Sequence, residues 1–233
     1  MVRFSKSLFA APVAVVAVLA LCVPTQAGGL IQQVPPDGSW VILKVDSELD
    51  IGGNLQSATR ELKVSSVGKQ EVDGEPARWI ELSTEVGGRK MVAKLLIAEK
   101  YLKADQDSFE HVAKGWARGR DGMLAELPKE RLRGLVVFAV GVPHFDKLAK
   151  KGKEKIQTEL GEYECEHATG QVEREGFQGN KAKFDGELWT CDKVPFGLVK
   201  AKVKVDFTKG SIESELTAVR SGSDAKSELP DAK

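Results

Sequence analysis

The sequence contains little histidine and little cysteine, with three residues of each among 233. It has no phosphate-binding glycine loop, no dinucleotide glycine fingerprint, no His-Glu-x-x-His pair and no nucleophile elbow. The 34 basic side chains balance the 34 acidic ones, so no net charge attracts the chain to nucleic acid or anionic lipid. Because 42% of the residues are hydrophobic, the chain is too apolar for intrinsic disorder. The composition indicates a globular protein without a recognisable catalytic motif.

The first 27 residues have the pattern of a secretory signal peptide. Arg3 and Lys6 precede an apolar run over residues 8–23, and small residues end at Ala27, where a signal peptidase would cut. The run of 16 residues is shorter than the roughly 20 that a spanning helix needs. An uncleaved membrane anchor is the alternative. We predict an exported protein, periplasmic or extracellular, that is not an integral membrane protein after cleavage.

Cleavage would leave two of the three cysteines in the mature chain. Cys22 is removed with the signal, and Leu21 stands where a lipoprotein signal carries a small residue, so we expect no lipid anchor. Cys165 and Cys191 remain as an even pair in a compartment that allows oxidation. A hairpin centred on Gln178 places these two cysteines opposite each other. We therefore predict a Cys165–Cys191 disulfide.

The same hairpin places two glycines opposite each other. Gly170 faces Gly186, and apolar residues lie on the same face on both sides of this pair. Facing residues without side chains weaken a flat ladder but permit a sharp bend, as at the corners of curved sheets. We predict a strongly curved sheet with this face directed inward.

Alternating apolar and polar residues indicate half-buried strands along most of the chain. The alternation over residues 41–51 ends at a Gly-Gly-Asn turn. Asp73-Gly74 accepts the positive φ angles of a type I′ turn and predicts a hairpin. Four consecutive strands between residues 41 and 98 predict an antiparallel meander. The clearest alternation runs over residues 199–207, where one face must be buried and the other solvated.

Two segments in the middle of the chain have a helical pattern. Phe109, Val112, Ala113 and Trp116 have i, i+3, i+4, i+7 spacing, with Asp107 or Ser108 as the N-cap, and a second helix is expected over residues 128–134. The predicted fold class is mainly β (α+β), a strongly curved antiparallel sheet or open half-barrel with one or two short helices covering its concave face. We expect one domain over 28–220 and a disordered tail over 221–233.

The three histidines offer few catalytic possibilities. His111 suits a solvated position beside Glu110, and His144 follows a proline in a loop. His167 lies two residues from Cys165 and shares its strand face, as a Cys-His nucleophile would require. A disulfide would consume that thiol, so we expect His167 to stack near Trp189 instead. We predict no catalytic residue, no metal site and no cofactor.

The order of segments resembles a known superfamily. A signal peptide, a four-strand meander, the segment from Phe109 to Trp116 and a second antiparallel run are similar to the lipoprotein-carrier superfamily of LolA and LolB. The segment Val194-Pro195-Phe196-Gly197-Leu198-Val199-Lys200 is also similar to a turn in uncharacterised secreted bacterial proteins of this shape. The resemblance implies an open β half-barrel whose concave face is covered by helices and holds acyl chains. No functional residue of the carriers matches a position in this sequence.

Three functions are compatible with these features. The first is a non-enzymatic exported protein that binds an apolar or lipid-like ligand in a β cup. Residues expected to line that cup are Leu82, Leu96, Phe109, Val112 and Trp116. The alternative is an envelope interaction or scaffold module whose core is filled by its own side chains and whose partner is an envelope protein. The third is a hydrolase that uses His167 or His144. Nucleic acid is not expected as a partner.

Overall fold

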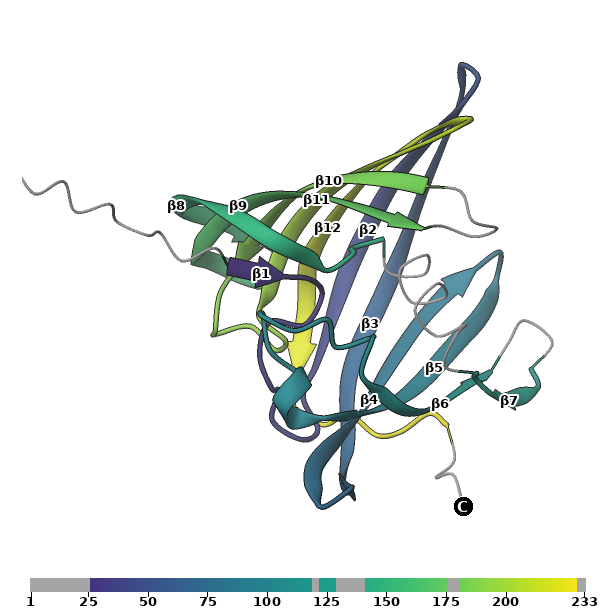
Figure 1. Ribbon diagram of the computed structural model, residues 1–233, viewed down its shortest axis with the longest axis vertical. Helices are drawn as coiled ribbons and strands as arrows, with labels where there is room; N and C mark the ends of the chain where they lie inside the picture. The colour runs from purple at the N-terminus through teal and green to yellow at the C-terminus, as the bar shows by residue number, and fades with distance from the viewer. Residues whose placement is uncertain (1–25, 119–121, 129–140, 176–180, 230–233) are drawn as a thin grey trace, which may run out of the picture.

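The computed structural model describes residues 26–118, 122–128, 141–175 and 181–229. Twelve strands form one sheet in the order β1-β8-β9-β10-β11-β12-β2-β3-β4-β5-β6-β7, and all neighbours are antiparallel (Figure 1). The strands are β1 (Gln26–Gly28), β2 (Trp40–Ile51), β3 (Asn54–Val72), β4 (Glu75–Val86), β5 (Arg89–Ala98), β6 (Val112–Arg118), β7 (Leu124–Glu126), β8 (Phe145–Thr158), β9 (Gly161–Glu175), β10 (Lys181–Thr190), β11 (Leu198–Phe207) and β12 (Gly210–Gly222). The single helical element within these ranges is the 3₁₀ turn η1 (Glu99–Tyr101).

The predicted turns and hairpin registers are confirmed. Asp73 and Gly74 have φ angles of 52° and 77°, as a type I′ turn requires, and they join β3 to β4. Strands β2 to β5 form the expected meander. In the later hairpin, His167 pairs with Trp189, and Gly170 pairs with Gly186. The hairpin registers predicted from the sequence are therefore present in both halves of the chain.

The two faces of the sheet have different chemistry. Val41, Leu43 and Val45 of β2 are at most 1% exposed and pack into the large buried cluster. Intervening residues such as Lys44 point to the opposite side and are exposed. We call the side with the large cluster the core face and the other side the outer face. Since cross-strand partners share a face, the register assigns each strand residue to one of the two.

The sheet is antiparallel as predicted, but it is neither closed nor strongly curled. Strands β1 and β7 are its two free edges. The expected sharp bend at Gly170 and Gly186 is wrong because other side chains fill the space that the glycines leave. The ring of Phe145, which is fully buried, lies against Gly186, and the Leu148 side chain lies against Gly170. The glycine pair therefore leaves room on the core face for the side chains of Phe145 and Leu148.

The helix expected between Phe109 and Trp116 is wrong. The Asp107 carboxylate accepts a hydrogen bond from the backbone N–H of Phe109 at 3.2 Å, but this cap leads into a turn. Strand β6 then begins at Val112 and pairs with β5. The edge of β5 provides hydrogen-bond partners for the backbone of residues 112–118, whereas an isolated helix of this length has marginal stability. The helical spacing of the apolar residues was coincidental. The second expected helix, over 128–134, lies almost entirely outside the described residues.

The C-terminal tail expected to be disordered is ordered as far as Leu229. Residues 221 and 222 complete β12, and the following segment packs on the outer face. The Glu81 carboxylate, only 3% exposed, accepts hydrogen bonds from the Ser227 hydroxyl and from the N–H groups of Glu228 and Leu229. The buried Lys94 ammonium donates to the Ser227 hydroxyl at 2.9 Å. A buried carboxylate thus fixes a segment whose sequence has no apolar pattern. Most of the predicted signal peptide, residues 1–25, lies outside the described residues.

The contact between Phe145 and Gly186 generates a stability prediction. A Cβ atom at Gly186 would overlap the Phe145 ring, so Gly186→Ala should lower the free energy of unfolding by about 1–3 kcal/mol. Phe145→Ala should cost about 3–5 kcal/mol because it leaves a cavity. In the double variant, the alanine at 186 should cost much less than it does alone. Urea denaturation of all four proteins measures this coupling, and strict additivity would contradict the proposed packing.

Candidate functional site

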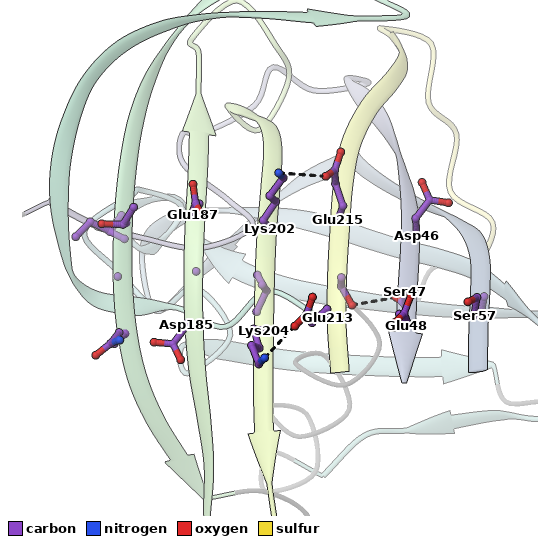
Figure 2. Close-up of a pocket in the computed structure, with 18 of the residues that line it drawn as sticks. Asp46, Ser47, Glu48, Ser57, Asp185, Glu187, Lys202, Lys204, Glu213 and Glu215 are labelled. Carbon is purple, nitrogen blue, oxygen red and sulfur yellow. Dashed lines mark hydrogen bonds and ion pairs between the residues drawn. The ribbon is translucent and has the colours of Figure 1, made fainter. Parts of the chain in front are cut away.

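A groove with a volume of about 1130 Å³ crosses seven adjacent strands, from β8 at one end to β3 at the other (Figure 2). Each strand contributes three consecutive residues to its lining. These are residues 147–149, 169–171, 185–187, 202–204, 213–215, 46–48 and 57–59. The groove therefore runs across the strands, and the sheet brings its lining together from distant parts of the chain.

The register places this groove on the outer face. The middle residues of the seven triplets are direct cross-strand partners and point to the core face. In sheet order they are Leu148, Gly170, Gly186, Val203, Ser214, Ser47 and Ala58. Their neighbours along the core face, such as Val45 and Leu216, do not line the groove. The walls are therefore the two flanking rows of outer-face side chains, and the backbone between them forms the floor.

The walls of the groove are strongly polar. One row contains Ala149, Thr169, Glu187, Lys202, Glu215, Asp46 and Thr59, and the other contains Lys147, Gln171, Asp185, Lys204, Glu213, Glu48 and Ser57. Lys204 and Glu213 form an ion pair at 2.9 Å, and Lys202 lies 3.7 Å from Glu215 (Figure 2). Hydrogen bonds from Thr59 and Lys44 lower the pKa of Asp46. The groove suits a polar, charged ligand and offers no nucleophile activated by a base.

The five residues expected to line an apolar cup are not brought together. Leu82, Phe109 and Val112 are buried in the large core cluster. Leu96 instead packs with Trp79 in a smaller cluster, against which Trp116 is partly buried. Leu96 pairs with Trp79 and Leu82 pairs with Ala93, so Leu82 and Leu96 lie on opposite faces of the sheet. None of the five lines the outer-face groove.

The core face remains apolar beyond the fully buried cluster. Leu49 pairs with Ile212, and Ile212 pairs with Val205; all three are only partly buried. Further along β2, Ile51 on the same face is 45% exposed. Beside this patch, Phe184 pairs with Val205 and is buried. The sequence indicated this exposed apolar surface, because the alternation over residues 41–51 continues beyond Val45, the last buried residue of β2.

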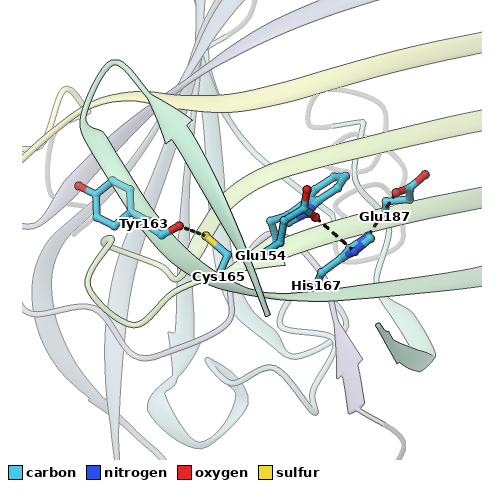
Figure 3. A network of polar contacts seen from close by, with 6 residues as sticks. Glu154, Tyr163, Cys165, His167 and Glu187 are labelled. Carbon is cyan, nitrogen blue, oxygen red and sulfur yellow. Dashed lines mark hydrogen bonds and ion pairs between the residues drawn. The ribbon is translucent and has the colours of Figure 1, made fainter. Parts of the chain in front are cut away.

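His167 lies in a cross-strand cluster on the outer face (Figure 3). Its ring stacks on Trp189 with centroids 4.5 Å apart, which confirms the stacking expected from the sequence. Its Nε2 atom lies 3.2 Å from Glu187, and its Nδ1 atom lies 3.5 Å from Glu154. Glu154 also accepts a 2.7 Å hydrogen bond from the indole N–H of Trp189. Both ring nitrogens are thus directed to carboxylates, and the cluster joins β8, β9 and β10.

The other histidines are also held by structural contacts. His111 is exposed and stacks on Tyr101 with centroids 3.8 Å apart. Burial lowers the pKa of His144, whose carbonyl accepts a hydrogen bond from Arg174. In the part of the chain that the structure describes, no three His, Cys, Asp or Glu side chains are placed to hold a metal ion. Nor, within those same ranges, is any helix long and apolar enough to cross a membrane.

Cys165 and Cys191 are free thiols in the structure, and the disulfide stays a prediction for the exported chain. The Cys165 thiol donates to the Tyr163 carbonyl at 3.7 Å rather than to His167 (Figure 3). Burial, together with the nearby Cys191 and Glu154, raises the pKa of Cys165 to about 11. Thr190, the last residue of β10, pairs with Glu166 of β9, so Cys191 lies directly after β10 and close to Cys165 of β9.

Comparison with known proteins finds similarity in shape only. No protein-family model matches the sequence, and no curated protein is similar to it. A Bacteroides fragilis protein described as exported, with a YmcC-like fold, is 13% identical; the alignment covers 83% of this chain and 99% of that one, with a TM-score of 0.40. A Parabacteroides distasonis protein described as a lipoprotein is 10% identical over 84% of this chain and 99% of that one, with a TM-score of 0.37.

A third similar structure is a Vibrio parahaemolyticus domain described as an outer membrane lipoprotein-sorting protein. It is 9% identical over 84% of this chain and 89% of that one, with a TM-score of 0.32. The similarity to all three structures concerns the arrangement of strands.

The two cysteines generate a redox prediction. In protein recovered from the cell envelope without reductant, we expect Cys165 and Cys191 to be linked, because the register places Cys191, just after β10, beside Cys165 of β9. Intact mass spectrometry should find the chain two hydrogens lighter and resistant to alkylation. Two alkylated thiols in that sample would contradict the link.

The reduced protein should show unequal thiol reactivity. At pH 8, a pKa of about 11 leaves only a small thiolate fraction at Cys165, so iodoacetamide should modify the more exposed Cys191 first. Peptide mapping after timed quenching measures the two rates. Equal rates in the folded protein, as in a urea-unfolded control, would contradict the burial of Cys165.

Proposed function

We propose that the protein is an exported, non-enzymatic binding protein, periplasmic or extracellular, that holds an apolar or lipid-like ligand against the core face of its sheet. The observation that supports this proposal is the apolar patch formed by Leu49, Ile51, Val205 and Ile212 beyond the buried core. We call these four residues the distal patch.

The distal patch has the features of an apolar binding surface. Leu49 pairs with Ile212, and Ile212 pairs with Val205. Ile51 follows Leu49 on the same face of β2, so the four residues form a continuous surface rather than scattered exposed residues. The patch adjoins the buried Phe184 ring, which lets a ligand continue the existing core. Each methylene that such a ligand buries contributes about 0.8 kcal/mol to binding.

The absence of a catalytic arrangement in the described residues supports a binding function. The Cys165 thiol bonds to a backbone carbonyl, and its raised pKa opposes thiolate formation. His167 is directed to two carboxylates rather than to a nucleophile. These contacts leave the hydrolase hypothesis without a paired base and nucleophile.

A second candidate is an envelope interaction module with a self-filled core. Phe145 favours it, because this fully buried ring occupies the space over the glycine pair that a ligand would otherwise enter. Under this hypothesis the core face is complete without a ligand, and crosslinking in whole cells should capture an envelope protein.

Ligand binding can be tested with a core-face variant and an outer-face control on neighbouring strands. Ile51→Ser combined with Ile212→Ser removes apolar groups from the distal patch and should weaken binding of a fluorescent fatty acid about tenfold. Leu55→Ser is the control, because Leu55 is 64% exposed but pairs with Asp50 and therefore lies on the outer face. Fluorescence titration and circular dichroism measure binding and folding in parallel.

The outcome separates the two candidate functions. Loss of binding in the core-face variant alone supports a ligand on that face. No fatty-acid binding by the unmodified protein, together with ligand-free native mass spectra of protein taken directly from the envelope, would contradict it and leave the interaction module.

A further inference from the structure

We infer that the outer-face groove binds an extended, positively charged polypeptide segment. This site is separate from the distal patch, because the groove is lined by outer-face side chains whereas the patch lies on the core face. The inference therefore does not depend on the proposed lipid-like ligand, and either can fail alone.

The charges of the groove differ from those of the whole chain. Its walls contain six carboxylates and three ammonium groups, although basic and acidic residues balance over the sequence. The acidic residues are Asp46, Glu48, Asp185, Glu187, Glu213 and Glu215, and the basic ones are Lys147, Lys202 and Lys204. A surplus of carboxylates along a concave surface attracts a cationic partner.

The strongest observation is that like charges face each other across β12 and β2. Glu213 pairs directly with Glu48, and Glu215 pairs directly with Asp46 (Figure 2). Like charges in direct cross-strand positions destabilise a sheet. Two such pairs side by side, in the same groove, impose a cost that a bound cation would relieve.

Internal lysines offset this repulsion only in part. Lys204 pairs with Glu213, Lys200 pairs with Glu215 at 2.7 Å, and Lys44 pairs with Asp46 at 2.9 Å. Glu48 has no ion-pair or hydrogen-bond partner within the ranges that the structure describes. The carboxylate oxygens of Glu48, in its pair with Glu213, are therefore available to accept hydrogen bonds from a bound cationic group.

The dimensions of the groove favour a chain rather than a single ion. Seven strands at about 4.8 Å spacing give a length of roughly 29 Å, which an extended peptide of about nine residues spans. The described carboxylates are not clustered closely enough to hold a metal ion. Polar side chains along the groove, including Gln171 on β9 and Ser57 on β3, can form hydrogen bonds with a peptide backbone.

The test uses the exported protein and fluorescein-labelled nonapeptides of lysine, glutamate and alternating glycine and serine. Fluorescence anisotropy in buffer with 0.15 M salt should detect binding of nonalysine only. Glu48→Gln combined with Glu213→Gln should weaken that binding about tenfold, because two wall charges are lost. The melting temperature should change little, since the variant removes both a like-charge pair and the exposed ion pair between Lys204 and Glu213.

Glu162→Gln combined with Glu164→Gln provides the matched control. It removes the same charge from exposed positions of β9 outside the groove, so it should leave nonalysine binding unchanged. Equal weakening in both variants would show nonspecific attraction and overturn the inference. Binding of nonaglutamate, or no binding of nonalysine to the unmodified protein, would also overturn it. Unchanged fatty-acid binding by the Glu48 and Glu213 variant would show that the two sites are distinct.

Discussion

The structure depends on the antiparallel register from β8 to β3, which runs without a shift through the rows of residues that line the groove. Because side chains alternate along every strand, this register assigns apolar residues to one face and charged residues to the other across seven strands. A shift of one residue in any pair would move charged side chains into the core. A single pairing pattern therefore produces both features: the buried cluster on the core face and the polar groove on the outer face of the same sheet.

Packing on the core face shows how one hairpin contributes to the whole sheet. Gly170 of β9 and Gly186 of β10 form a cross-strand pair without side chains, and the Phe145 ring and the Leu148 side chain of β8 occupy that space. The large aromatic ring of Phe145 thus fits where the next two strands carry glycine. Complementarity of this kind gives the interior its close packing without requiring the sheet to bend.

Local features were predictable from the sequence, and non-local ones were not. The Asp73-Gly74 turn and the pairing of Gly170 with Gly186 follow from residues near each other in the chain. The groove depends on β12 lying beside β2, which no local pattern specifies. The segment from Phe109 to Trp116 was misassigned because its apolar spacing fits a helix, while the available edge of β5 decided in favour of a strand. Tertiary pairing overrode local periodicity there.

The attachment of the tail to Glu81 has a consequence for shortened forms of the protein. Ser227, Glu228 and Leu229 supply hydrogen-bond donors to this buried carboxylate on β4. A chain that stops before residue 227 lacks these donors, and a buried carboxylate that loses its hydrogen-bond partners costs free energy. Residues more than 140 positions away in the sequence therefore stabilise β4.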